Sequence, residues 1–217
     1  MAVDLFRDRA DAGRRIAERL LEYEDENTLV LAIPRGGVPV GYEVAKRLDA
    51  QFDVIVPRKI PIPWNPEAGF GAVTVDGTMV LNDGMVRSLD LSEDEIEQAA
   101  EEVRQEIVRR TAIYRGDKPP PDVEDKSVIL VDDGLASGYT MLAAIESLRK
   151  HEPSSVIVAV PVASQGAAKL VRPKADRLAA LIVSESLPFA VANYYVEWRD
   201  LTDEEVMGYL KSSVVSR

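Results

Sequence analysis

The chain has 217 residues, of which 46% are hydrophobic, 29% are charged and none is cysteine. This length and apolar content predict a single globular domain over residues 1–217, with a core that needs no disulfide. No apolar run approaches the roughly 18 residues of a membrane span, and the formal net charge of −11 argues against a nucleic-acid-binding surface. Because cysteine is absent and the first residues are charged rather than signal-like, we expect a cytoplasmic protein.

The first quarter of the chain alternates helical and strand-like patterns. Apolar residues at helical spacing predict a helix over 6–24. Short branched runs predict strands over 29–34 and 53–57, with a helix over 38–48 between them. This order of strand, loop, helix and strand indicates a parallel βαβ unit.

The next stretch, 61–76, contains three prolines and predicts a long loop, followed by a hairpin over 70–82. A helix is then predicted over 92–115, because Ser92 and Glu95 have the spacing of a capping box. Glycine and a run of prolines end this helix just after residue 115.

The remaining chain continues the alternation. Strands that alternate with helices predict an α/β fold with a doubly wound, mainly parallel sheet flanked by helices. The elements are a strand and a helix within 127–150, a strand over 154–163, a helix over 164–172, a strand over 178–184 and a helix from near Thr202.

The most informative segment is 128–141, VILVDDGLASGYTM. Four apolar residues predict a buried strand, with Asp132 and Asp133 at its carboxyl end, where parallel sheets bind ligands. The small loop 136–140 leads into a helix and offers backbone N–H groups and a positive dipole end to a phosphate. Two adjacent acids suit sugar hydroxyls or a hard cation. Together these features indicate a sugar-phosphate site.

An ordinary buried strand with a capped helix would give part of the same pattern. Paired acids after a strand also occur in NTPases and receiver domains, but the chain contains no G-x-x-x-x-G-K-[ST] loop. The segment resembles the phosphoribosyl pyrophosphate (PRPP) signature of type I phosphoribosyltransferases. That pattern has four apolar residues, two acids, two further residues and a small-Thr/Ser-Gly-x-Thr/Ser loop.

The resemblance implies a Mg²⁺-dependent pentosyltransferase that moves a 5-phosphoribosyl group from PRPP to a nitrogen acceptor and releases pyrophosphate. It implies that Asp132 and Asp133 are catalytic and hold the ribose hydroxyls, with the metal bound indirectly, and that Lys59 is catalytic too. It also implies a hood from the C-terminal segment 184–217 and a helical insertion at 83–121. The residues implied for the 5-phosphate are Ala136, Ser137, Gly138, Tyr139 and Thr140.

Two further segments resemble the family's pyrophosphate contacts. One follows the strand at 29–34, where two glycines permit close approach of the backbone to a ligand. The other follows the strand at 53–57, where two cations can hold a diphosphate. Residues 61–71 would then be a flexible loop that closes over the site. The implied pyrophosphate ligands are Arg35, Gly36, Gly37, Arg58 and Lys59.

The acceptor stays open. The aromatic tail resembles that of 6-oxopurine enzymes and implies base contacts at Phe189 and Tyr194, although a core or dimer contact would leave the same residues there. Two departures count against hypoxanthine or guanine: Ala136 stands where those enzymes have Asp, and no lysine lies between Lys174 and Lys211. A nucleobase is therefore expected, without its identity.

The sequence does not identify the general base. Glu67, Glu185 and Glu197 are candidates, and the alternative is that each is a solvated surface glutamate. Two other functions compete with nucleotide synthesis: a non-catalytic regulator that senses PRPP, and another chemistry on the same fold, such as hydrolysis. The expected partners are PRPP and a small-molecule acceptor, without nucleic acid or membrane. Because family members are often dimers, a homodimer is also considered.

Overall fold

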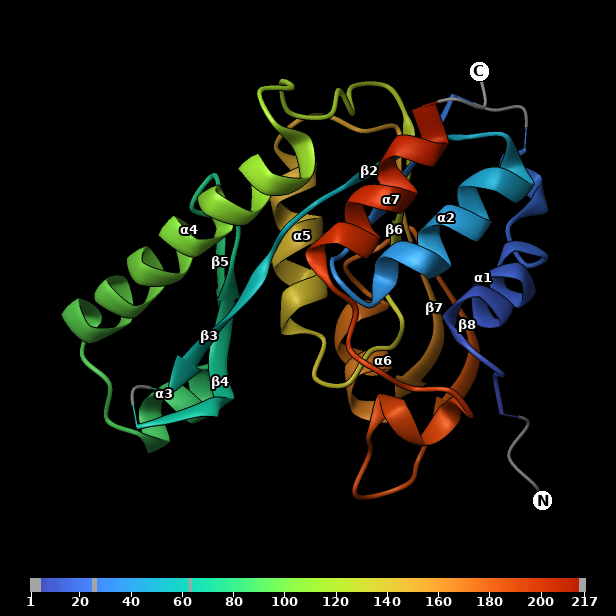
Figure 1. Cartoon of the computed structure of the whole chain (residues 1–217). Coiled ribbons are helices and arrows are strands. Elements are labelled where there is room, and N and C mark those ends of the chain that lie inside the picture. Colours follow the sequence, from blue (N-terminus) through green and yellow to red (C-terminus); the bar gives the residue numbers. More distant parts are fainter. Residues whose placement is uncertain (1–4, 25–26, 63, 215–217) are drawn as a thin grey trace.

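The computed structural model describes residues 5–24, 27–62 and 64–214. Its centre is a five-stranded sheet in the order β2-β1-β6-β7-β8, and each neighbouring pair is parallel (Figure 1). The predicted α/β fold with a parallel sheet is confirmed. The strands are β1 (Thr28–Ala32), β2 (Gln51–Val54), β6 (Ser127–Val131), β7 (Ser155–Ser164) and β8 (Arg177–Ser184).

Helices cover both faces of this sheet because its strands are apolar on both sides. The helices α1 (Arg9–Ala17) and α2 (Gly37–Leu48) pack on one face, and α5 (Tyr139–Arg149) and α6 (Gln165–Val171) pack on the other. Alternate residues of each strand point to opposite faces. In β6, therefore, Ile129 packs with α1 and α2, whereas Val128 packs with α5.

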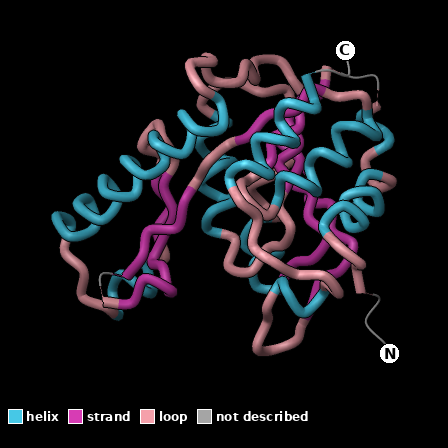
Figure 2. Tube along the Cα trace, viewed as in Figure 1, coloured by secondary structure: helices cyan, strands magenta, loops and turns pink. Residues whose placement is uncertain are grey.

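A second lobe projects from the sheet (Figure 2). It contains a three-stranded antiparallel sheet of β3 (Arg58–Ile62), β4 (Asn65–Val73) and β5 (Met79–Leu81). The helices α3 (Asp83–Ser88) and α4 (Glu93–Arg115) complete it. The predicted capping box of Ser92 and Glu95 is present at the start of α4, and its buried residues recur at helical spacing.

The first predicted helix, 6–24, is wrong in its extent. Asp8 caps α1 by accepting from the amide of Asp11, and the helix ends at Ala17 before a short 3₁₀ turn at Leu21–Tyr23. Phe6 stays extended and forms a parallel bridge with Tyr195. This bridge ties the start of the described chain to its C-terminal segment.

The predicted long loop is also wrong. Residues 58–62 and 65–73 are strands, so 61–71 forms most of a hairpin. Pro61 is misleading because β3 is an edge strand and its pairing with β4 shifts register at this residue, where proline is tolerated. β2 ends at Val54 instead of residue 57, because β1 beside it ends at Ala32.

The last helix, α7 (Asp203–Val214), packs against α2 and α4 and so joins the lobe to the sheet. A short 3₁₀ turn at Val191–Tyr194 precedes it. Among the described residues, no helix combines the length and apolar character needed to cross a membrane.

A second junction between lobe and sheet lies at Asp76, in the turn between β4 and β5. Its carboxylate accepts hydrogen bonds from Thr74 and Thr78 in the same turn and from Ser147 and Lys150 at the end of α5. Partial burial alone would raise the pKa of Asp76, but these hydrogen bonds hold that pKa well below its usual value.

The Asp76→Asn variant should therefore lose stability at neutral pH, by about 1 kcal/mol for a partly exposed cluster. Because a lowered pKa favours folding only while the carboxylate is ionised, the deficit should shrink as the pH falls below about 4. Urea unfolding at pH 7 and at pH 3 measures both effects, with the exposed Asp117→Asn as control. An equal deficit at both pH values would contradict the assignment.

A candidate active site at the edge of the parallel sheet

Two loops meet at the carboxyl ends of the adjacent strands β1 and β6. The loop of Arg35, Gly36 and Gly37 follows β1, and Asp132 and Asp133 follow β6. A Cβ at Gly36 would lie 1.9 Å from Oδ2 of Asp133, and one at Gly37 would lie 2.6 Å from the carbonyl oxygen of Val131. Glycine is thus required at both positions by the close approach of the two loops.

The predicted phosphate loop leads from this edge into α5. Gly138 has φ +88°, which favours glycine, and no side chain in the described chain caps the start of α5. Leu135 pairs with Ala163 of β7, and Ser164 Oγ donates to the carbonyl of Ala136 at 2.7 Å. The loop is therefore fixed from its base while residues 136 and 137 stay exposed, and the first amides of α5 are left without an intrahelical acceptor, as they are in helix starts that bind anions.

The paired aspartates are held in different ways. Oδ1 of Asp132 accepts from the amide of Asp133 at 2.8 Å. Oδ2 of Asp133 accepts from Nε of Arg9 at 2.8 Å, and both side chains are largely buried, at 14% and 9% exposed. Tyr195 donates to the carbonyl of Asp133 at 2.6 Å. The second acid is thus neutralised by α1, whereas the first has no cation paired with it in the described structure.

This arrangement raises the pKa of both carboxyl groups. Burial, together with the neighbouring Asp133 carboxylate, raises the pKa of Asp132 well above its usual range. Burial also raises the pKa of Asp133, although the Arg9 guanidinium offsets part of the rise. Two buried carboxyl groups that share one guanidinium can still bind a further cation or accept hydrogen bonds from hydroxyl groups.

The predicted pyrophosphate ligands are only partly brought together. Arg35 lies at the crevice, and its guanidinium is 3.9 Å from Asp203 of α7. Arg58 opens β3 and pairs with Glu106 of α4 at 2.9 Å. Lys59 is the next residue of the same strand, so its side chain points to the opposite face and lies against Gly69 of β4. The expectation that both cations face one crevice is wrong, because they lie in a strand rather than in a loop.

The aromatic tail is placed partly in the core. Tyr194 is buried, and its hydroxyl donates a hydrogen bond to the hydroxyl of Ser184. Phe189 is half-buried, with its ring 5.6 Å from that of Tyr194. Tyr194 thus packs inside the protein, while a base contact at Phe189 stays a prediction.

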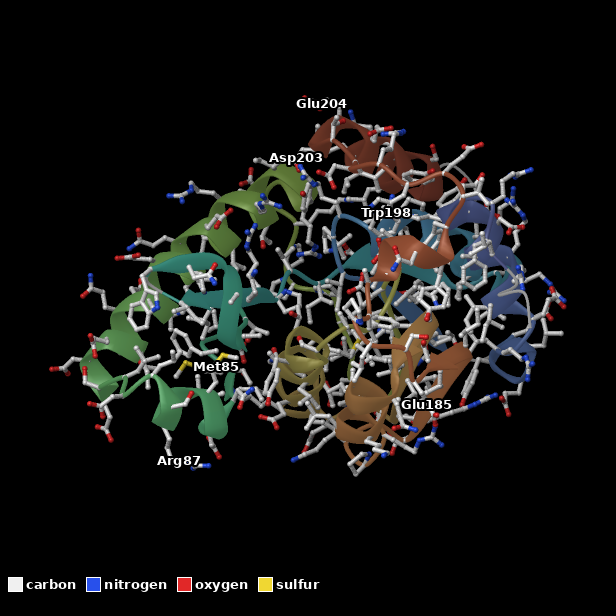
Figure 3. All side chains as sticks on the ribbon, turned by 90° about the horizontal axis from the view of Figure 1, so that it is seen from below. Met85, Arg87, Glu185, Trp198, Asp203 and Glu204 are labelled. Atoms are coloured by element: carbon white, nitrogen blue, oxygen red, sulfur yellow. The ribbon has the colours of Figure 1, made fainter. Side chains whose placement is uncertain are left out.

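The three candidate bases differ in what surrounds them. Glu185 follows β8 (Figure 3) and accepts from Gln165 at 2.5 Å. Glu197 is exposed beside the start of α1. The side chain of Glu67 lies outside the described residues. None of the three is brought to the aspartates by a contact in the described structure, so the general base stays open.

Arg9 is the functional-site residue that sequence reasoning missed. Besides Asp133, it donates to the carbonyl of Arg199 at 2.8 Å, and its guanidinium lies 3.9 Å from the centre of the Trp198 ring. Figure 3 shows Trp198 on the C-terminal segment that crosses this region. The signal available was weak: an arginine in the first turn of a helix, where acids are usual.

A divalent cation fits the chemistry of this edge. Among the described residues, no group of three His, Cys, Asp or Glu side chains forms a metal cage. Mg²⁺ does not need one, because it keeps water and substrate phosphates and takes one or two carboxylates from the protein. Asp132 is the carboxylate best placed for it, since Asp133 already pairs with Arg9.

Comparison with known proteins shows which family shares this sequence and architecture. A family described as phosphoribosyl transferase domain matches residues 76–195. A "Putative phosphoribosyl transferase" from Mycobacterium tuberculosis is 37% identical over 206 residues, which are 95% of this chain and 46% of that protein. The crystal structure of TT1426 from Thermus thermophilus is similar with a TM-score of 0.80 and 38% identity, over 96% of this chain and 98% of that one.

The chain therefore belongs to the phosphoribosyl transferase domain family. It is also 29% identical over 136 residues to "Bifunctional protein PyrR" from Deinococcus radiodurans, which covers 62% of this chain and 55% of that protein. The chain spans about half the length of the curated relatives it matches. The matched family region contains the signature loop and the paired aspartates.

The Asp132→Asn variant should be more stable than the natural protein at neutral pH. A raised pKa means that ionisation disfavours the fold, so this penalty appears as the pH rises through the pKa of the folded state and is absent below about 4. We expect the Tm to rise by about 2 °C or more at pH 7.5 and to be unchanged near pH 4. Thermal unfolding without ligand measures it. A lower Tm at pH 7.5 would show that the carboxylate is structural.

The Arg9→Gln variant should have the opposite effect, because it leaves the buried Asp133 carboxylate unpaired. We expect a loss of about 3 kcal/mol in the free energy of unfolding at pH 7. The matched control is Arg14→Gln on the same helix, whose exposed pair with Glu43 should contribute at most about 1 kcal/mol. Denaturant unfolding of both variants checks the difference, and equal losses would refute it.

Proposed function

We propose that this protein transfers a 5-phosphoribosyl group from PRPP to a nitrogen of a nucleobase and releases pyrophosphate. One observation carries the proposal: the Arg-Gly-Gly loop lies against the paired aspartates at neighbouring strand ends, with Gly36 in contact with Asp133, and the loop 136–140 leads from those aspartates into α5. A donor with a phosphate at one end and a diphosphate at the other needs two anion sites on either side of a sugar. The two loops supply such a pair.

The 5-phosphate would bind at the start of α5. The amides of residues 136–140 and the hydroxyls of Ser137 and Thr140 are the donors, and the dipole of the eleven-residue helix adds to them. Because Leu135 and Ser164 fix the base of the loop, these donors need little rearrangement to bind. Binding energy at this distant phosphate can orient the reacting carbon.

The ribose would lie over the paired aspartates. Asp132 accepts from the ribose hydroxyls, while Asp133 holds its position through Arg9. The negative charge of the pair also suits the positive charge that develops on the anomeric carbon. A bound Mg²⁺ would supply Lewis-acid stabilisation of the diphosphate at Asp132.

The reaction breaks the bond between the anomeric carbon and the diphosphate oxygen, and the electron pair leaves with pyrophosphate. The acceptor nitrogen supplies the pair for the new bond and then loses its proton. Arg35 and Arg58, which pair with Asp203 and Glu106, would supply positive charge to the departing diphosphate. No nucleophilic side chain is required.

A screen of free bases with PRPP and Mg²⁺ tests the proposal, with nucleoside monophosphate detected by mass and pyrophosphate measured in parallel. We expect one base to give equal amounts of both products. Asp132→Asn should lower kcat/KM by about 10²-fold or more, although it stabilises the fold, and the exposed Asp117→Asn should not.

Each other outcome has a separate meaning. Pyrophosphate released at the same rate with and without a base would indicate hydrolysis of PRPP. Binding of PRPP without release under any acceptor would indicate the PRPP-sensing regulator. Unchanged turnover in Asp132→Asn would remove the proposed role of the aspartates.

A further inference from the structure

One face of α4 carries a row of two charged side chains and one tyrosine. Glu106, Arg110 and Tyr114 follow each other at intervals of four residues and so lie on one side of the helix. Oε1 of Glu106 is 2.9 Å from Arg58 of β3 and 3.5 Å from Arg110. One carboxylate oxygen therefore serves two guanidinium groups from two different elements.

A second carboxylate oxygen, that of Asp203, also contacts two side chains. Oδ1 of Asp203, at the start of α7, accepts from the hydroxyl of Tyr114 at 2.6 Å and lies 3.9 Å from Arg35. Figure 3 shows Asp203 where α7 approaches the end of α4. Burial and this hydrogen bond raise the pKa of Tyr114 to about 12, so the tyrosine stays a neutral donor.

The two arrangements form one cluster. Tyr114 follows Arg110 by one turn of α4 and donates to Asp203, whose carboxylate lies 3.9 Å from Arg35, so the three guanidinium groups belong to one connected set of contacts. Burial lowers the pKa of Arg58, and so do the charges of Arg110 and Arg35. Three positive groups face two carboxylates there, although the whole chain has a net charge of −11. The five charged side chains are about one quarter to two fifths exposed, so an anion from solvent can reach them.

We propose that Arg110 of α4 is a ligand of the leaving pyrophosphate, and that Glu106 competes with pyrophosphate for Arg58 and Arg110. This inference rests on the proposed function and adds to it a residue outside the two loops. Diphosphate oxygens carry more charge than one carboxylate and can accept from several guanidinium groups at once. Glu106, which is 37% exposed, can turn into solvent when the arginines exchange partners.

The competition has a catalytic use. A site with three free guanidinium groups would hold its product tightly, and product release limits many enzymes. Glu106 and Asp203 take back the arginines as pyrophosphate departs, which speeds its release. Loss of Glu106 should therefore tighten pyrophosphate binding, although it removes a contact.

Titration calorimetry with inorganic pyrophosphate and Mg²⁺ tests this on the full chain. Glu106→Gln should bind pyrophosphate about three- to tenfold more tightly, since two partly exposed ion pairs no longer compete. Arg110→Gln should bind it about tenfold more weakly. The matched control is Arg109→Gln, because Arg109 is the adjacent residue of α4 and is exposed; its affinity should stay within about twofold of the natural protein.

Weaker or unchanged binding in Glu106→Gln, or equal affinities of the Arg110 and Arg109 variants, would overturn the inference. These outcomes leave the proposed function intact if the base screen yields a nucleotide. If the natural protein binds no pyrophosphate and still forms a nucleotide, the inference alone fails. If it neither binds pyrophosphate nor forms a nucleotide, the proposed function fails with it.

Discussion

The buried ion pair between Arg9 and Asp133 is the contact on which the crevice depends. Two adjacent carboxylates at a strand end repel each other and lose hydration, and one guanidinium removes part of that cost. The same guanidinium binds the carbonyl of Arg199 and covers Trp198. One side chain thus fixes the first helix, the central strand end and the C-terminal segment relative to one another.

The crevice retains groups that weaken the fold. Asp132 is partly buried without a cation paired to it in the described structure, and its neighbour Gly37 admits no side chain. Such departures from the most stable sequence are typical of functional sites. Contacts of the lobe stabilise the fold elsewhere. Tyr114 of α4 donates a hydrogen bond to Asp203 of α7, and Asp76 accepts hydrogen bonds from Ser147 and Lys150 at the end of α5.

Local pattern was enough to predict the strands, the helices between them and the capping box of α4, because each depends on residues close in sequence, and strands that alternate with helices imply a parallel sheet. The Arg9 contact was out of reach, since it joins residues 124 positions apart. The end of β3 and the start of β4 were mistaken for a loop because prolines are frequent there and sequence alone does not reveal an edge strand. That error also misplaced Lys59, because consecutive residues share a crevice in a loop but not in a strand.

The regular spacing along α4 has a consequence for how such chains can change length. A residue inserted into the helix before Glu106 would rotate everything after it by about 100° and carry Arg110 and Tyr114 away from Arg58 and Asp203. Insertion of a whole turn would shift these groups along the axis by about 5 Å with little rotation. Length variation in this family should accordingly spare the interior of α4 and collect in the loops at its ends.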